Sequence, residues 1–169
     1  SPYRTATSVD GLGAEVIPKA NIRQDLDLMM AAGFRLIRVF DSDDKVAKQT
    51  LEVIRADNLN LKMQLGIFIQ GGNENFNQAQ LARAVKLAND YSDIVLAVSV
   101  GNENMVGFSF NKVPVADMAR YIATVRRQIT QPVTTDDNYA FWATAPTQIT
   151  DVVDFASVHT YAVLDTIFD

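Results

Sequence analysis

The residues best suited to chemistry are Gly101-Asn102-Glu103, which follow the apolar run Ile94 to Val98. The run predicts a buried strand, so these three residues stand where that strand ends. A carboxyl group held there between apolar walls would have its charged form destabilised, which suits a general acid that protonates a leaving oxygen. Asn102 could hydrogen-bond a sugar hydroxyl, and Gly101 permits close backbone approach. The alternative is a glutamate in a solvated turn among ordinary loop residues.

A charged residue, Arg38, interrupts the apolar run Arg35 to Phe40. An unpaired buried charge is too costly to be accidental, so Arg38 either has a role in the site or forms a structural ion pair with an acidic partner. Asp41, at the end of the same run, could be that partner, could hold a sugar hydroxyl, or could cap the next helix, although residues 42–44 compete for the cap. The acidic stretch 41–44 has no calcium-loop spacing, so we predict no metal site there.

Three aromatic residues, Tyr139, Phe141 and Trp142, follow the short predicted strand Val133 to Thr135. Rings in a loop after a strand suit stacking on the apolar faces of sugars, because they offer large, rigid contact areas. In the alternative interpretation, Phe141 packs in the core and only one ring faces a groove.

Asp136 and Asp137 directly follow the same segment, and His159 ends a later predicted strand, residues 155–159. The two aspartates could bind sugar hydroxyls, with a solvated turn as the alternative. His159 is the only histidine, and a lone histidine is more often structural than functional, so both uses stay open.

Composition excludes several classes of function. The chain has 169 residues, 48% of them hydrophobic, with a net charge of −5, no cysteine and one histidine. A net negative chain without a basic cluster is unsuited to nucleic acid. Disulfides, thiolate catalysis and cysteine-based zinc sites are impossible, and a multi-histidine metal site is unlike this sequence. We predict no cofactor and no metal. There is also no run of eighteen apolar residues and no leader-like start.

The elements that must position these residues alternate along the chain. Continuous apolar runs predict strands, and apolar residues at helical spacing predict helices between them. The strands are expected at residues 35–40, 61–69, 94–100, 133–135 and 155–159. Such alternation predicts an α/β fold with a parallel sheet, in which the loops after the strands carry the site.

On these segments the chain resembles glycoside hydrolase family 17, the β-1,3-glucanases and β-1,3-glucanosyltransferases. The resemblance covers most of the chain, and Val100-Gly101-Asn102-Glu103 is its most specific part because it is similar to the family's acid/base motif. The matching segments are 1–3, 37–41, 65–68, 100–103, 133–136 and 159–161.

The resemblance implies a (β/α)8 TIM barrel with about six of its eight βα units present, as one catalytic domain over residues 1–169, truncated at both ends. It implies retaining hydrolysis or transglycosylation of β-1,3-glucan, with Glu103 as the acid/base. The family's nucleophile is a glutamate ending strand seven, and no matching motif occurs here. The implied substrate-binding residues are Tyr3, Arg38, Asp41, Asn102, Asp136, Tyr139, Trp142, His159 and Tyr161.

The resemblance further implies that Arg38 points into the barrel toward the nucleophile and that Tyr161 lies beside it. It favours a periplasmic, secreted or membrane-tethered location. Two alternatives remain. The chain could be a non-catalytic glucan-binding half-barrel, or a subunit that completes a barrel with a partner chain. A flavodoxin-like nucleotide binder would also fit the strand count, but Gly11-Leu12-Gly13 lacks the third glycine and the helix of a phosphate-binding loop.

Overall fold

A computed structural model describes residues 17–161 of the chain. They form one five-stranded parallel sheet with helices between the strands. The strands are β1 (Leu36–Arg38), β2 (Lys62–Ile67), β3 (Val95–Asn102), β4 (Val133–Asn138) and β5 (Ser157–His159). The helices are α1 (Lys19–Ala31), the π-helical turn η1 (Asp44–Lys48), α2 (Gln49–Ala56), α3 (Glu74–Asp90), α4 (Val115–Arg126), α5 (Tyr139–Trp142) and α6 (Thr147–Thr150).

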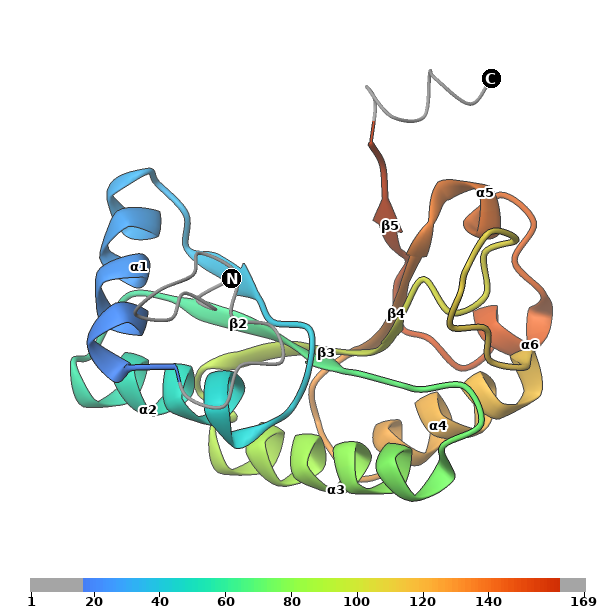
Figure 1. Ribbon diagram of the computed structural model, residues 1–169, viewed down its shortest axis with the longest axis horizontal. Helices are drawn as coiled ribbons and strands as arrows, with labels where there is room; N and C mark the ends of the chain where they lie inside the picture. The colour runs from blue at the N-terminus through green and yellow to red at the C-terminus, as the bar shows by residue number, and fades with distance from the viewer. Residues whose placement is uncertain (1–16, 162–169) are drawn as a thin grey trace.

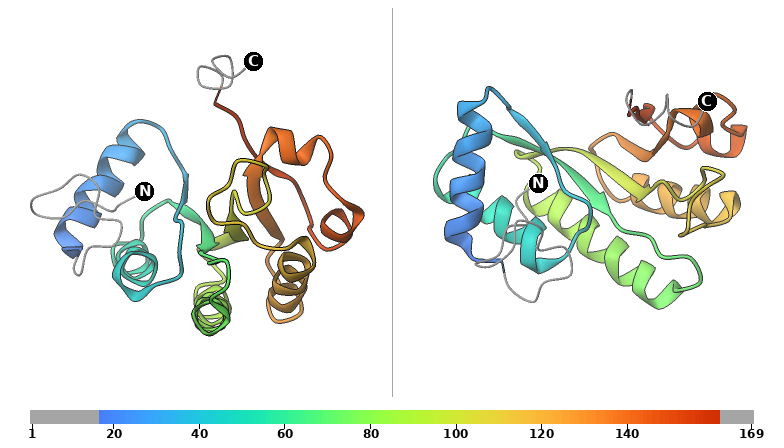
Figure 2. Two further views of the ribbon diagram at one scale, coloured as in Figure 1. Left: turned by 45° about the vertical axis from the view of Figure 1, so that its right-hand side comes forward. Right: turned by 45° about the horizontal axis from the view of Figure 1, so that its top comes forward.

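The sheet has the order β1-β2-β3-β4-β5, so each strand pairs with its neighbour in sequence. It curls, and the helices form an arc around its convex side (Figures 1 and 2). The fold is therefore a curled parallel half-barrel. The sequential order also shows that the flavodoxin-like alternative is wrong for the described strands, because that fold reverses the strand order at a switch point.

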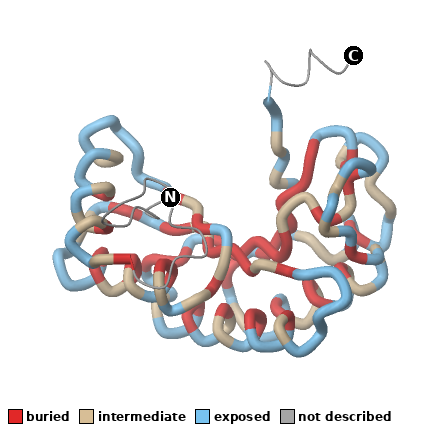
Figure 3. The backbone as a smooth tube through the Cα atoms, viewed as in Figure 1, coloured by how far each residue is buried: buried red, intermediate tan, exposed pale blue. Residues whose placement is uncertain are grey.

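The two faces of the sheet differ because successive side chains of a strand point to opposite sides. Apolar side chains fill the space between the sheet and the helices. Buried residues are concentrated along the central strands (Figure 3). The fully buried side chains of this core include Leu26, Leu51, Met63, Leu65, Val98, Met118 and Ile122. The concave face carries polar groups, and these build the site described below.

Local signals explain where several helices begin and end. Asp43 caps η1, since its Oδ1 accepts the backbone N–H groups of Lys45 and Val46, each at 3.0 Å. Asn73 caps α3 in the same way, through the N–H of Phe76 at 3.3 Å. After α1, Gly33 adopts a φ of +92°, a left-handed conformation that ends the helix at low cost. The helix cap left open among residues 41–44 thus belongs to Asp43.

The α/β class and all five described strands agree with the sequence-based expectation, but two strands extend further than expected. β3 continues to Asn102 and β4 to Asn138, because Asn102 pairs in register with Asp136, and Asn138 with His159. The solvated-turn interpretation of Asp136 and Asp137 is wrong, since both lie in β4 and are fully buried.

The aromatic segment expected in a loop after the fourth of these strands is instead the single-turn helix α5. Asn138 starts it by accepting the backbone N–H of Ala140 at 2.9 Å. The segment similar to the family's first strand, with Tyr3, lies outside the described residues. Within residues 17–161, no helix has the length and apolar character needed to cross a bilayer.

Candidate active site

Glu103 stands directly after β3, at the carboxyl end of the sheet, on an unusual backbone. Its φ is +49°, in the left-handed region, and its backbone N–H donates to the Asp136 carbonyl at 2.8 Å. Gly101, two residues earlier, has a φ of +82°, and a Cβ there would lie 2.4 Å from Oδ1 of Asn104. The turn that presents Glu103 therefore requires glycine at position 101.

Asn104 stabilises this turn through hydrogen bonds of its side chain. Its side chain is buried, accepts the backbone N–H of Asn102 at 2.9 Å, and donates to the carbonyls of Ile69 at 3.3 Å and Asn111 at 2.8 Å. Asn104 was given no role from the sequence alone, because in one interpretation the residues around Glu103 were ordinary loop residues. The structure makes it the joint between the loops that follow β2 and β3.

Asp137 supports the same turn from β4. Its carboxylate accepts the backbone N–H groups of Met105 at 2.9 Å and Asn138 at 2.8 Å. Burial raises the pKa of Asp137 above its usual value, the two backbone N–H groups lower it in part, and the nearby charge of Glu103 raises it. Asp137 thus binds the segment after Glu103 with one oxygen, Oδ2, while Oδ1 binds the N–H of the next residue in β4.

Arg38 is the centre of the polar network on the concave face. Its Nη2 lies 2.7 Å from Oδ2 of Asp136 and donates to Oδ1 of Asn102 at 2.6 Å. Asp136 is fully buried, and its second oxygen accepts from Nε2 of Gln64 at 3.0 Å. The guanidinium also lies over the ring of Phe40, 4.7 Å from its centroid. Arg38 therefore has its acidic partner, and that partner is Asp136 rather than Asp41.

His159, on β5, joins Arg38 to Glu103. Its Nδ1 lies 2.9 Å from Oε1 of Glu103, and its Nε2 lies 3.1 Å from Nη1 of Arg38. The ring of Tyr161 packs edge-on against the imidazole, at a centroid distance of 6.1 Å. The Glu103 side chain is 26% exposed, so it is reachable from solvent while fixed by His159. Glu103 is not a freely solvated turn residue.

A cavity of about 430 Å³ adjoins this network at the ends of β1, β2 and β3. Its walls include three phenylalanine rings, and its polar lining shares Asn102 with the network. It is lined by Phe40, Asp41, Asp43, Phe68, Phe76, Gln80 and Asn102. Burial, together with the negative charge of Asp43, raises the pKa of Asp41 to about 6, with Arg83 opposing in part.

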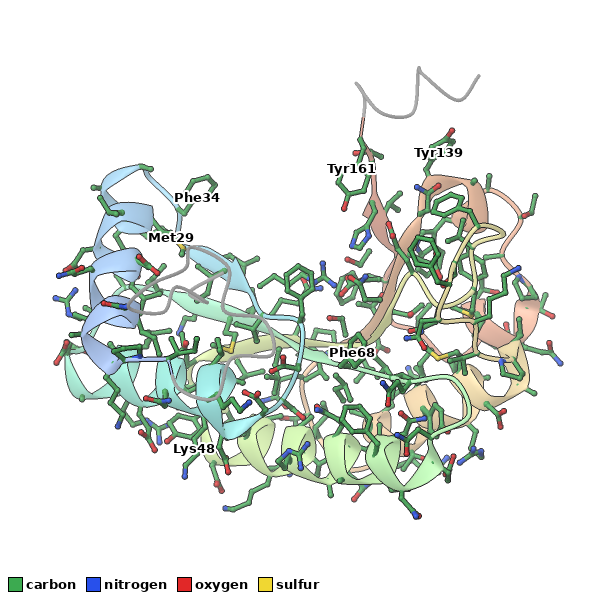
Figure 4. The ribbon with its side chains drawn as sticks, viewed as in Figure 1. Met29, Phe34, Lys48, Phe68, Tyr139 and Tyr161 are labelled. Carbon is green, nitrogen blue, oxygen red and sulfur yellow. The ribbon has the colours of Figure 1, made fainter. Side chains whose placement is uncertain are left out.

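The aromatic candidates separate in the structure. Phe141 is buried in the core, Tyr139 is 41% exposed, and the indole N–H of Trp142 donates to the Ser157 carbonyl at 2.9 Å. The alternative in which Phe141 packs as core therefore describes that residue correctly. Tyr139 and Tyr161 lie at the same end of the molecule, above the strand ends (Figure 4).

The sequence from residue 2 to residue 166 matches the family model of the BtgE/BtgC glycoside hydrolase domain. The chain belongs to this family. The Glu103 carboxyl group lies at the carboxyl end of the parallel sheet. Barrel enzymes keep their catalytic groups at this end of the sheet. In the part of the chain that the structure describes, no cluster of three or more acidic, histidine or cysteine side chains could hold a metal ion.

Solved structures share the fold of this BtgE/BtgC domain. An endo-laminarinase from Formosa Hel1_33_131 superposes with a TM-score of 0.81 at 24% identity, over 90% of this chain and 47% of that one. An active-site mutant of the Rhizomucor miehei β-1,3-glucanosyltransferase, in complex with laminaritriose, gives 0.70 at 18% identity, over 85% and 52%. A Parabacteroides merdae β-glucuronidase gives 0.60 at 15% identity, over 86% and 18%.

The chain thus spans about half the length of the first two of these structures. A search among curated proteins gave no significant match.

Proposed function

We propose that this domain serves retaining hydrolysis or transglycosylation of β-1,3-glucan, as a glycoside hydrolase family 17 enzyme would, with Glu103 as the acid/base. The observation that carries the proposal is the Glu103 carboxyl group, 2.9 Å from Nδ1 of His159 at the carboxyl end of β3. The names of two structures with the same fold, an endo-laminarinase and a β-1,3-glucanosyltransferase, support the choice of substrate.

In this proposal Glu103 gives a proton to the departing glycosidic oxygen while a second carboxylate attacks the sugar. Glu103 then removes a proton from water, or from an acceptor hydroxyl when a chain is transferred. Retaining enzymes place the two carboxyl groups about 5–5.5 Å apart.

The second carboxylate is proposed to lie outside residues 17–161. Asp136 and Asp137 are the carboxylates built into the strand beside Glu103, and both are fully buried. Asp136 pairs with Arg38 and Gln64, and Asp137 binds two backbone N–H groups. Neither has an oxygen left to act as a nucleophile.

The proposed substrate path runs over the cavity that adjoins Asn102. Phenylalanine rings offer apolar surface to sugar faces, while Asp41 and Asn102 offer groups for sugar hydroxyls. Tyr139 and Tyr161 would extend this surface, because both are well exposed near the strand ends. We retain Arg38, Asp136, His159, Tyr3 and Trp142 as predicted contributors to substrate binding, the first three acting through the network around Arg38.

The test is Glu103→Gln in the whole protein, assayed on laminarin-type glucan. Turnover on this poor leaving group should fall by about 10²–10⁴-fold with little change in glucan binding, because the proton donor is lost and the shape is kept. On an aryl glycoside with an acidic leaving group, the first step of the variant should be slowed much less, since such a leaving group departs without being protonated. Glu52→Gln, on the surface of α2, is the matched control. Near-normal hydrolysis of glucan by Glu103→Gln would end the proposal.

A second candidate function is supported by the pairing of the sheet. Among the described residues, β1 pairs only with β2, and β5 only with β4, so each edge strand has a free side. A glucan-binding half-barrel, or a subunit completed by a partner chain, would fit this arrangement. Glucan binding without hydrolysis by the isolated chain, together with a change of its mass in solution when a partner is added, would favour this candidate.

A further inference from the structure

The imidazole of His159 lies between two groups of opposite charge that come from distant parts of the chain. On one side Nδ1 is 2.9 Å from Oε1 of Glu103, and on the other Nε2 is 3.1 Å from Nη1 of Arg38. The His159 side chain is only 13% exposed, so these two contacts define the surroundings of both ring nitrogens.

Arg38 decides which ring nitrogen carries the hydrogen. A guanidinium donates through all of its nitrogens and accepts through none. Nε2 of His159 must therefore accept from Nη1, since a hydrogen on Nε2 would point at the hydrogens of the guanidinium. A neutral imidazole has one donor and one acceptor, which places its hydrogen on Nδ1, facing Glu103.

The guanidinium cannot easily turn away from this arrangement. Its Nη2 is held 2.7 Å from Oδ2 of the fully buried Asp136 and 2.6 Å from Oδ1 of Asn102. Because a guanidinium is planar and rigid, fixing Nη2 also fixes the direction in which Nη1 donates.

We propose that Arg38 fixes His159 as its Nδ1–H tautomer, and that His159 thereby gives the two oxygens of Glu103 different roles. Oε1 permanently accepts the Nδ1 hydrogen, and Oε2 is the oxygen that exchanges a proton with the substrate. The division rests on the proposed function for the role of Glu103, whereas the tautomer does not. His159 acts through Glu103 and is a positioning residue.

Oε2 of Glu103 gives up one proton in the first step and regains one in the second. In the first step the Oε2–H bond breaks as a hydrogen–oxygen bond forms on the departing sugar. In the second step an O–H bond of water or of an acceptor hydroxyl breaks, and Oε2–H forms again. The Nδ1–H bond of His159 remains intact throughout, so the ring orients Glu103 without itself exchanging a proton with substrate.

The tautomer can be read directly because the 169-residue chain contains one histidine. Long-range ¹H–¹⁵N correlation spectra of the ¹⁵N-labelled full chain at neutral pH distinguish the two neutral tautomers and the charged ring. We expect one Nδ1–H ring. An Nε2–H ring, a charged ring or a mixture of tautomers would overturn the proposal.

Removing Arg38 tests the cause. Arg38→Met alone would leave Asp136 buried without its cation, so the variant to use is Arg38→Met with Asp136→Asn. In this double variant the His159 ring should lose its preference for the Nδ1–H tautomer. The control, Arg126→Met, removes a surface ion pair with Asp154, and His159 should keep the Nδ1–H tautomer in it. Retention of a pure Nδ1–H ring in the double variant would contradict the assigned role of Arg38.

Two substitutions at the ring test the positioning role in the whole protein. The amide nitrogen of His159→Asn can take the place of Nδ1, whereas that of His159→Gln takes the place of Nε2. On glucan, kcat should fall in the Gln variant by roughly tenfold to a hundredfold more than in the Asn variant, as expected for one hydrogen bond to a charged group, with KM little changed. Equal kcat in both variants would overturn the positioning role. The spectra need no activity, so a failed glucan assay leaves the tautomer result standing.

Discussion

The two faces of the curled sheet are built from the same strands but hold their side chains in different ways. On the convex face, Leu65 and Val98 are packed in an apolar core beneath α3 and α4. On the concave face, Arg38, Asp136 and His159 are held by directed contacts to named atoms. Apolar packing tolerates exchanges that conserve volume, whereas removing one partner of a buried ion pair leaves an uncompensated charge. The convex face therefore stabilises the fold, and the concave face fixes the geometry of the site at a cost in solvation.

The largest effect on stability is expected from breaking the central ion pair of the concave face. Arg38→Met should lower the free energy of unfolding by about 3–5 kcal/mol, because Asp136 would stay buried with no cation beside it. Adding Asp136→Asn should recover part of this loss. Denaturant unfolding of both variants measures the difference. Equal stability of the single and double variants would show that the buried carboxylate is not the cause.

Truncation of the apolar face should cost slightly less and should act only on stability. Leu65→Ala on β2 should reduce the free energy of unfolding by about 2–5 kcal/mol, because the side chain is fully buried and leaves a cavity. Leu96→Ala on β3 is the matched control, since that leucine is 52% exposed. Below its unfolding temperature, the Leu65 variant should retain its affinity for glucan. A comparable loss of stability in both variants would show that burial of Leu65 is not the cause.

Asp41, at the border of the polar network, should reveal its burial through pH. Its pKa is about 6 in the folded protein, against an ordinary value of 3.8 for an exposed aspartate. Between these two pH values the folded protein therefore binds more protons than the unfolded chain. The free energy of unfolding should therefore fall as pH rises from about 4 to 6. Asp41→Asn should remove this decline and raise stability at pH 7 by about 1–3 kcal/mol.

Thermal unfolding across this pH range measures the effect, with the exposed Asp151→Asn as the comparison. A decline that persists unchanged in the Asp41 variant would assign it to another group.

The smallest effect should come from a polar group that lies on the concave face without taking part in its network. Ser99 pairs in register with Thr134, which places it on the same face as Asp136. Its hydroxyl is buried and has no hydrogen-bond partner among the described residues. Ser99→Ala should change the free energy of unfolding by less than about 1 kcal/mol in either direction. A large loss would mean that this hydroxyl contributes to the network after all.

The same contrast explains what the sequence alone could predict. The runs around Leu65 and Val98 gave their strands at once, because a continuous apolar stretch has few alternatives in a parallel sheet. The polar tips of β3 and β4 were missed, since Asn102 and Asp136 resemble turn residues until their register is known. Burial of a polar residue depends on its partner, and local sequence does not contain that partner.

The contacts of the site itself were even less accessible. Arg38 and His159 are 121 positions apart, and only the curl of the sheet brings them together. The apolar run before Glu103 indicated its position correctly, but the supports provided by Asn104 and Asp137 required the loop geometry. The roles of Tyr139 and Trp142 toward sugar remain predictions.

The contact between Arg38 and His159 joins the first and last described strands across the hollow of the half-barrel. A flatter sheet would pull these two side chains apart and release Glu103 from its imidazole at the same moment. The curvature of the sheet and the orientation of Glu103 are therefore coupled in this molecule. By linkage, any ligand that needs an oriented Glu103 must also strengthen the bend of the sheet.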